Sequence, residues 1–298
     1  MTPLVVPLHA TVALAHAELQ VLAEDQGVDL LHIKGPALDP SLLRPWPDDG
    51  TGSPRASIDA DVLVRPSHVG RLLSTLETNG WRCLYDFADG SAFEHAATWA
   101  RDDLSSVDVH RYFPGIERDA ERAFDALWSD RSHQMIAGVD CTVPSLPAQR
   151  LIVLIHAARG RGPRSAADRE RAWFALERHD REEIDALADE LGARVALRAG
   201  TGRLESVRGE RTYPLWRHLT TSDGSLLGLW WARVRSAPDA RTAVRVGVRM
   251  LVPNAHRMET QLGRPPTRRE LASAYRRRMV FGVSTLRRWA SSRVGVQR

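Results

Sequence analysis

Apolar and polar residues alternate along the first third of the chain in a way that predicts a helix followed by several strands. Apolar residues recur at helical spacing over residues 7–26, and Gly27 follows as a C-cap. The runs VDLLHI (28–33) and IDADVLV (58–64) are apolar but too short for helices, so each predicts a core strand. WRCLYDF after Gly80 predicts a third strand, and the alternating LSSVDVHR (104–111) a later one. Residues 91–100 suit a helix or a strand.

Short elements connect these strands. We expect a helix over residues 37–43 that starts after Pro36, a surface loop over 44–57, and a helix from Ser67 to about Asn79.

The pattern changes after Gly115 and becomes mainly helical. It predicts a helix over 117–129, a hairpin over 133–143, a helix over 147–159, and a helical stretch over 165–191. Residues 267–294 read as a basic amphipathic helix. The sequence thus predicts an α+β fold, with a mixed sheet and flanking helices over residues 1–144 and a mainly helical domain over residues 145–298.

The central strand, residues 58–64, carries two acids. Asp59 and Asp61 are two residues apart, so on a strand they point to the same face. Like charges at that separation repel each other, and a divalent cation with a preference for oxygen ligands would remove the conflict. Two solvated acids at a strand edge are the alternative explanation.

A second feature lies at the end of the preceding strand. Lys34 and Gly35 stand between that strand and a short helix, an arrangement that leaves backbone N–H groups free to bind an anion. Lys34 is also the only lysine, since every other residue in the Lys and Arg total of 41 is an arginine. We interpret this as a requirement for a compact ammonium group at the site, against chance as the alternative.

A third acid follows on another strand. Asp108 alternates with Val107 and Val109, and His110 shares its face. Asp108 is therefore a candidate third metal ligand, and His110 a candidate for orienting a carboxylate or an acceptor. Elsewhere, we expect His156 to be a hydrogen-bonded core histidine and Asp168 a helix N-terminal acid.

Composition limits the remaining possibilities. The net charge of +4 is mildly basic, and the hydrophobic content of 43% is ordinary for a soluble globular protein. We see neither a signal peptide nor a run of the ~18 apolar residues that a membrane span needs, and we expect a cytoplasmic protein. The two cysteines, Cys83 and Cys141, are far apart and not in a zinc-binding spacing.

Together these motifs resemble an uncharacterised nucleotidyltransferase family of the DNA polymerase β-like nucleotidyltransferase superfamily. The family pattern LLKGxAL, RxxxDIDLLV, GW and VDLH corresponds to LHIKGPAL (31–38), RASIDADVLV (55–64), Gly80-Trp81 and VDVH (107–110). The resemblance covers residues 10–160 and implies a polymerase β-like fold for the first domain. This chain departs from the superfamily motif at Pro36, which replaces a residue that is usually Gly or Ser, and the loop before Asp59 is longer than usual.

The resemblance also implies roles for residues. Asp59 and Asp61 would bridge two Mg²⁺ ions, and Asp108 would complete the site of the catalytic ion. Lys34 and Gly35 would bind the β and γ phosphates of a nucleotide. Arg55 would reach the triphosphate or pair with an acid, and His110 would lie beside the nucleotide or acceptor.

The implied reaction is Mg²⁺-dependent transfer of a nucleoside monophosphate from an NTP to a hydroxyl or phosphate acceptor, with release of pyrophosphate. ATP is the default donor, and a peptide natural product or a small molecule is the favoured acceptor. The first alternative is an RNA- or tRNA-directed, toxin-type transferase whose arginine-rich tail binds the RNA. The second is a non-catalytic scaffold that binds a nucleotide or a peptide.

Overall fold

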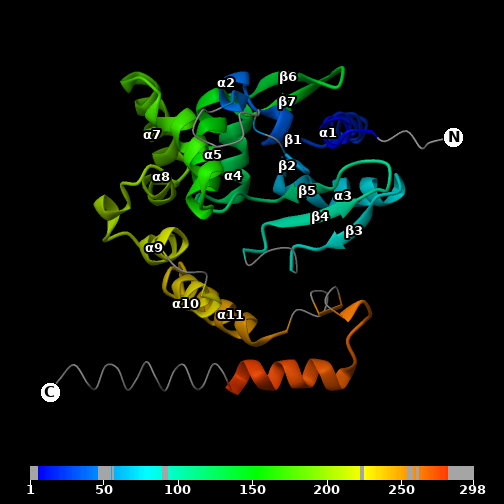
Figure 1. Ribbon diagram of the computed structural model, residues 1–298, viewed down its shortest axis with the longest axis vertical. Coiled ribbons are helices and arrows are strands. Elements are labelled where there is room, and N and C mark those ends of the chain that lie inside the picture. Colours follow the sequence, from blue (N-terminus) through cyan, green and yellow to red (C-terminus); the bar gives the residue numbers. More distant parts are fainter. Residues whose placement is uncertain are drawn as a thin grey trace. The chain divides into compact units, whose positions relative to one another are not determined.

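The computed structural model describes residues 6–45, 55, 57–88, 93–221, 225–253, 258–259 and 262–280. The chain forms two compact units, Met1–Thr220 and Thr221–Arg298 (Figure 1). The expected domain boundary between residues 144 and 145 falls inside the first unit, and the division at that point stays a prediction.

A five-stranded mixed sheet lies at the centre of the first unit. Its strands are β1 (Leu30–His32), β2 (Ala60–Val64), β3 (Arg82–Tyr85), β4 (Ala96–Ala100) and β5 (Val107–His110), in the order β1-β2-β5-β4-β3. β2 and β5 are parallel, and the other neighbouring pairs are antiparallel. The predicted mixed sheet is therefore present, and residues 96–100 of the ambiguous segment form a strand.

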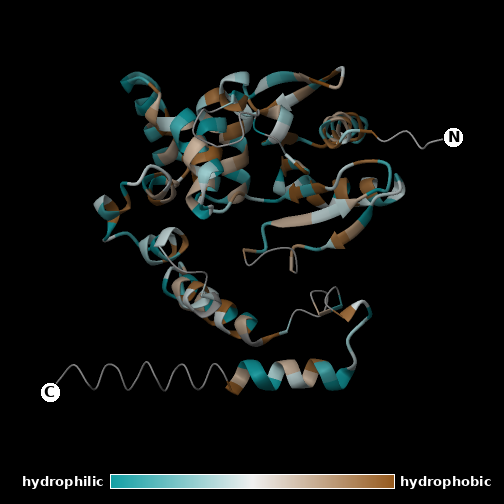
Figure 2. Cartoon of the chain, viewed as in Figure 1, coloured by the Kyte–Doolittle hydropathy of each residue, from teal (hydrophilic) through white to brown (hydrophobic). Residues whose placement is uncertain are grey.

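Residues of β2 and β5 point alternately to the two faces of the sheet, so that one face is apolar and the other carries polar groups. Ala60, Val62 and Val64 pack with Val107 and Val109 into one core, together with α1 (Leu8–Asp25) and α3 (Val69–Thr78). The intervening residues of both strands point to the opposite face. These are Asp61, Leu63, Asp108 and His110, and they bring polar groups together on that face. Hydrophobic residues colour these strands brown in Figure 2.

The opposite face packs against helices that follow it in sequence. Leu31 and Leu63 share a core with α4 (Ala120–Ser129), α5 (Leu146–Arg159) and α8 (Arg194–Gly200). A β6–β7 hairpin (Ser132–Ile136 and Val139–Val143) connects α4 to α5. Since sheet and helices share one core, α5 is fixed relative to the strands that carry the acids.

Two predicted helices differ from the structure. The helix expected at 37–43 is a 3₁₀ turn (Gly35–Ala37) followed by a short α2 (Pro40–Leu43), because the second proline starts a new helix with Asp39 as its N-cap. The helical stretch over 165–191 is interrupted. It consists of α6 (Pro163–Arg169), a π-helical turn (Glu170–Phe174) and α7 (Arg178–Glu190).

One arginine stabilises the interruption between α6 and α7. A helix end leaves backbone carbonyls without partners. Arg181 donates hydrogen bonds to the carbonyls of Trp173, Phe174 and Leu176, at 3.1, 2.9 and 2.7 Å. The break also lies beside the buried Trp173 and therefore belongs to the core.

The first unit ends in a 3₁₀ turn (Leu204–Val207) and α9 (Tyr213–Thr221), whose last residue falls in the second unit. The second unit is helical where it is described. It contains α10 (Leu226–Arg235), α11 (Ala240–Leu251) and a helix over residues 268–280. The predicted basic helix 267–294 is thus present up to residue 280, and its remainder lies outside the described residues. In the described part of the chain, no helix combines the length and the apolar character that a membrane crossing requires.

Candidate active site

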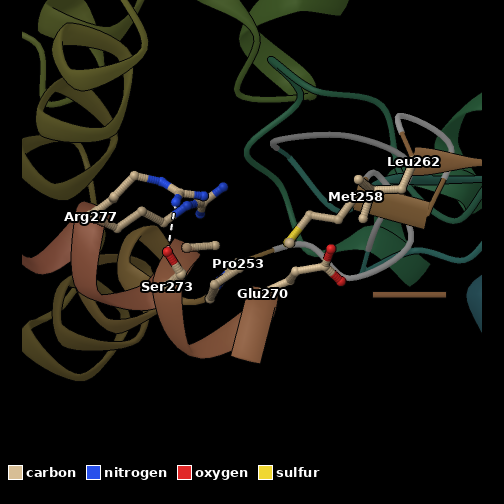
Figure 3. Close-up of a pocket in the computed structure, with 8 residues that line it drawn as sticks. Pro253, Met258, Leu262, Glu270, Ser273 and Arg277 are labelled. Carbon is tan, nitrogen blue, oxygen red and sulfur yellow. Dashed lines mark hydrogen bonds between the residues drawn. The ribbon is translucent and has the colours of Figure 1, made fainter. Parts of the chain in front are cut away.

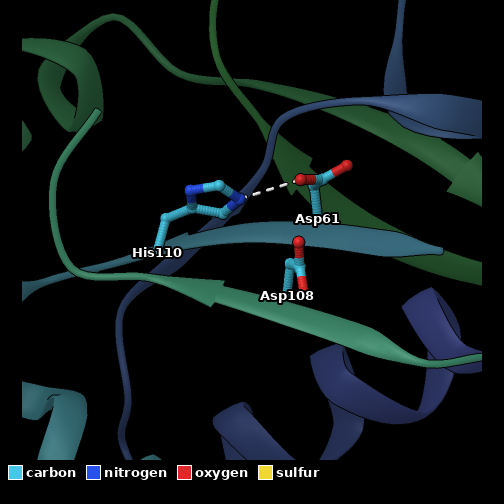
Figure 4. A group of neighbouring side chains, drawn as sticks. All are labelled: Asp61, Asp108 and His110. Atoms are coloured by element: carbon cyan, nitrogen blue, oxygen red, sulfur yellow. Dashed lines mark hydrogen bonds and ion pairs between the residues drawn. The ribbon is translucent and has the colours of Figure 1, made fainter. Parts of the chain in front are cut away.

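The two parallel strands bring three potential metal ligands together. Asp61 on β2 is the register partner of Asp108 on β5, and His110 follows two residues later on the same face. One ligand atom from each of the three residues lies within 4.8 Å of the others (Figure 4). Asp61 and His110 are buried, whereas Asp108 is half-buried. The side chains predicted to share a face thus form one cluster.

The hydrogen bonds around the acids leave oxygens available for a metal. Oδ1 of Asp61 accepts from Lys34 Nζ at 2.6 Å and is 2.8 Å from Nε2 of His110. Oδ1 of Asp108 accepts from the Thr98 hydroxyl at 2.6 Å. Among the described residues, Oδ2 of neither acid has a hydrogen-bonding partner. Each carboxylate is therefore held through one oxygen and offers the other to a cation, and oxygen donors of this kind suit Mg²⁺.

Lys34 keeps Asp61 ionised. Burial alone would raise the pKa of this carboxyl, but the Lys34 charge and the His110 hydrogen bond outweigh burial and hold the pKa well below its usual range. The exposed fraction of the Asp61 side chain is 2%, and that of Lys34 is 13%. In this structure the only lysine of the chain thus binds the central acid, a contact that sequence analysis did not predict.

Asp59 lies apart from this cluster. It precedes β2, outside the group formed by the other ligands, and its Oδ1 accepts from the Ser57 hydroxyl at 3.2 Å. Burial raises the pKa of Asp59, and the charges of Asp61 and Asp108 raise it further. Asp59 is therefore within electrostatic range of the cluster, and a cation between these acids would relieve the repulsion that it experiences.

The Lys34-Gly35 turn packs directly against the segment that leads into Asp59. Gly35 has a φ of +60°, a left-handed conformation that glycine adopts without strain. A Cβ at this position would lie 3.0 Å from Cβ of Ser57 and 3.6 Å from Nε2 of His16. The turn therefore requires glycine for its conformation and for its close contact, and it joins the two motifs into one site.

A buried histidine pair supports this turn, and sequence analysis missed it. Oε1 of Gln20 accepts from the Thr142 backbone N–H at 3.1 Å and from His32 Nε2 at 3.1 Å. His32 Nδ1 is consequently free to accept from His16 Nδ1 at 2.8 Å. Burial lowers the pKa of His16 to about 4 and that of His32 well below its usual value, so both rings are neutral at pH 7. This chain of hydrogen bonds fixes β1 against α1 beside Gly35.

The structure places Arg55 in an ion pair. Its Nε is 3.0 Å from Asp168 Oδ1, and Arg171 lies 3.3 Å from the same oxygen. Asp168 lies in the last turn of α6, where it bonds two arginines, so it is not the helix N-terminal acid that the sequence suggested. Of the two roles considered for Arg55, the structure shows the pairing with an acid.

The last turn of α5 contains two further polar residues that the sequence motifs did not identify. His156 is half-buried and its Nδ1 has no partner among the described residues, so the expectation of a hydrogen-bonded core histidine is wrong. Arg159 lies one turn further along. The sequence contains no signal for either residue, because only the fold brings α5 to the sheet.

A separate pocket lies in the second unit and has a different character. Its lining combines apolar side chains such as Met258 with the basic Arg277 and the acidic Glu270 (Figure 3). Arg277 donates to the Ser273 hydroxyl at 2.7 Å, and Arg278 to the carbonyl of Val252 at 2.7 Å. These basic side chains thus make contacts within the second unit.

Comparison with known proteins finds a family match within the first unit. Residues 9–208 match the family described as "Uncharacterised nucleotidyltransferase". Among solved structures, the chain is similar to an antigenic nucleotidyltransferase-like protein from Paracoccidioides brasiliensis, with 13% sequence identity and a TM-score of 0.35. That match covers 64% of this chain and 92% of the other. No curated protein matches the chain.

Proposed function

The chain belongs to the uncharacterised nucleotidyltransferase family, and from this premise we propose that it transfers a nucleoside monophosphate from an NTP to a hydroxyl or phosphate acceptor. Pyrophosphate would be the second product. The observation that carries the proposal is the pairing of Asp61 with Asp108 across parallel strands, where each acid keeps one oxygen uncommitted among the described residues.

The acids fit a magnesium site with Asp61, Asp108 and Asp59 as ligands, and the proposed reaction uses two such ions. Bound Mg²⁺ would neutralise the phosphate charges and orient the reacting groups, which is most of what phosphoryl transfer requires of an enzyme. The raised pKa of Asp59 supports this assignment, since burial and the charges of Asp61 and Asp108 raise it more than Lys34 and the Ser57 hydroxyl lower it.

The remaining residues take their roles from their contacts. His110 orients Asp61 through the hydrogen bond from Nε2 and acts as a positioning residue. Lys34 neutralises Asp61 and lies next to the Gly35 turn, where it can also contact a bound phosphate. Arg55 braces the segment before β2 through Asp168. Asp108 is the acid placed to take a proton from an acceptor hydroxyl.

We take ATP as the default donor and a small molecule or a peptide as the acceptor, with RNA as the alternative. The direct experiment is incubation with each NTP labelled at the α-phosphate, Mg²⁺ and candidate acceptors. We expect label transfer and pyrophosphate release by the wild type and neither by Asp61→Asn or Asp108→Asn. Label transfer that persists in both variants or without a divalent cation would refute the proposal.

A further inference from the structure

The last turn of α5 carries a cation on the side of the sheet where the acids lie. The guanidinium carbon of Arg159 is 5.5 Å from the centroid of the Phe113 ring. The Phe113 ring is in turn 6.2 Å from the ring of His110, which contacts Asp61. Arg159 is thus separated from the metal-ligand cluster by about one layer of side chains.

Among the described residues, no acid pairs with Arg159, whereas several other arginines of the first unit form ion pairs. In the first unit, Arg55 and Arg171 share Asp168, and Arg150 lies 3.5 Å from Asp180. Arg159 forms neither an ion pair nor a hydrogen bond with any described residue, and its Nε is buried without a partner. Arg159 is half-buried. Among the described residues, Nε also has no partner in Arg150 and Arg171, but those two arginines have an acid within ion-pair distance. A partly buried guanidinium without such an acid is stabilised when it binds an anion.

The surroundings do not compensate for this charge. Burial lowers the pKa of Arg159 to about 10, and the attraction of Asp61 offsets only part of that effect. The Phe113 ring and the helix C-terminus each favour a cation, but neither satisfies the N–H donors of the guanidinium. Arg159 therefore has a planar set of donors available beside the site.

The pKa of His156 responds to the positive charges near this end of α5. His156 and Arg159 are three residues apart and share a helix face. Burial lowers the pKa of His156 to about 3, and the charges of Lys34 and Arg159 lower it further. Lys34 and Arg159 thus act on the same ring, one from the Gly35 turn and the other from α5. Contacts link both cations to Asp61, since Lys34 binds it directly and Arg159 is connected to it through Phe113 and His110. Two cations near one site suit a ligand with several negative charges.

We propose that Arg159 binds a phosphate group of the donor nucleotide, so that α5 and the Lys34-Gly35 turn hold the triphosphate from two sides. This inference rests on the proposed function and adds to it a binding residue outside the sequence motifs. A guanidinium presents paired N–H donors that match two phosphate oxygens, which an ammonium group cannot do.

The test is calorimetric titration of the full chain with ATP and with pyrophosphate, each in the presence of Mg²⁺. We expect Arg159→Gln to bind both ligands about 10- to 100-fold more weakly than the wild type, which is the loss of one charge-assisted contact. Arg159→Lys should bind with intermediate affinity. Thermal unfolding of each variant shows whether it is folded at the temperature of the titration.

Arg203→Gln is the matched control. Arg203 lies over the Trp173 ring at 4.6 Å in the same unit, and burial also lowers its pKa. Arg203→Gln should bind ATP and pyrophosphate as the wild type does, since the charges that act on Arg203 are those of Arg198, Asp185 and Arg181 and not those of the site acids. An equal loss in both variants would mean that the loss reflects general destabilisation, and the assignment of Arg159 would be wrong.

The outcomes separate this inference from the proposed function. If the wild type binds ATP and Arg159→Gln binds it equally well, the Arg159 assignment fails while the proposed function stands. If the wild type binds pyrophosphate through Arg159 but does not bind any NTP, the phosphate site stands and the proposed function fails. If the wild type binds neither ligand, both are refuted.

Discussion

The three acids of the site differ in how the protein compensates their charge. Asp61 is buried and ionised because Lys34 and His110 both bind its Oδ1. Among the described residues, the Ser57 hydroxyl is the only side-chain donor to Asp59, and the pKa of Asp59 is raised. The fold therefore depends on the charge of Asp61, whereas burial and the neighbouring acids make the charge of Asp59 unfavourable.

This difference predicts opposite effects of two matched substitutions on stability. Asp61→Asn leaves Lys34 without its partner and should lower the free energy of unfolding by about 3 kcal/mol. Asp59→Asn removes a repelling charge and should raise it by about 1 kcal/mol. Denaturant unfolding of the metal-free variants at pH 7 measures both changes. Equal destabilisation by the two substitutions would contradict the description of the site.

The same pKa shifts predict how each effect depends on pH. The pKa of Asp61 is lower in the folded than in the unfolded state, so its stabilising contribution is complete above its ordinary value of 3.8 and is lost as the pH falls below about 4. The pKa of Asp59 is raised in the folded state, so its destabilising effect is complete at neutral pH and is relieved as the pH falls through that raised value. Unfolding curves of the wild type and of each variant are measured between pH 3 and pH 8. The difference in free energy of unfolding between wild type and variant should become smaller as the pH falls, for both variants. A pH-independent difference for Asp61→Asn would argue against the ion pair.

Replacing Lys34 by arginine tests whether the site requires the shape of the ammonium group or only its positive charge. The ammonium group lies 2.6 Å from Asp61 beside the Gly35 turn. The planar, delocalised guanidinium of an arginine does not reproduce a compact point charge at that position. Lys34→Arg should therefore lower the affinity for ATP about tenfold although the charge is kept. The measurement is a titration with ATP and Mg²⁺. Wild-type affinity would mean that the site does not distinguish the two cations.

At the residue scale, the sequence predicted the acids but not what they contact. The i, i+2 spacing of Asp108 and His110 placed them on one face, as the structure confirms. The ion pair between Lys34 and Asp61 joins residues 27 positions apart. The position of Arg159, which pairs with no acid in the described part of the chain, depends on how α5 packs. Tertiary contacts of this kind leave no local pattern in the sequence.

At the scale of elements, the position of α5 decides which side chains reach the sheet. Its neighbour α8 approaches closely at Gly200, where a Cβ would lie 2.6 Å from the backbone carbonyl oxygen of Leu154. A backbone atom inside a packed helix cannot move aside cheaply. The small residue at the end of α8 thus sets the distance between the two helices.

Gly200→Ala should therefore lower the free energy of unfolding by about 1–3 kcal/mol through overpacking. Gly70→Ala is the control, because Gly70 is exposed in α3 and a Cβ there would meet nothing within 4 Å. That substitution should stabilise the protein by about 0.5–1 kcal/mol through helix propensity. Thermal unfolding compares the two, and a stable Gly200→Ala variant would mean that α5 and α8 can separate.

Elements with a strong hydrophobic period were predicted well, and those that depend on packing were not. The helix over 7–26 and the strands around residues 30, 62 and 108 are present because burial of their apolar residues decides their conformation. The interruption between α6 and α7 was missed, since it is stabilised by Arg181 from the following helix. The sequence pattern there is compatible with a continuous helix.

At the scale of the whole molecule, every residue assigned to the site lies within the first compact unit. The family match over residues 9–208 falls within that unit as well. The sequence predicted a division at residue 144, where the pattern changes from mixed to helical. Hydrophobic periodicity records such a change in element type, but it does not reveal that sheet and helices share one core.

The central claim is that Asp61 and Asp108 hold Mg²⁺ for a bound NTP, and calorimetric titration of ATP with and without Mg²⁺ tests it most directly. The wild type should bind ATP only when Mg²⁺ is present. Asp108→Asn keeps the ion pair between Lys34 and Asp61, but added Mg²⁺ should no longer raise its affinity for ATP. ATP binding of equal affinity with and without Mg²⁺, or unchanged Mg²⁺-dependent binding by Asp108→Asn, would contradict the claim.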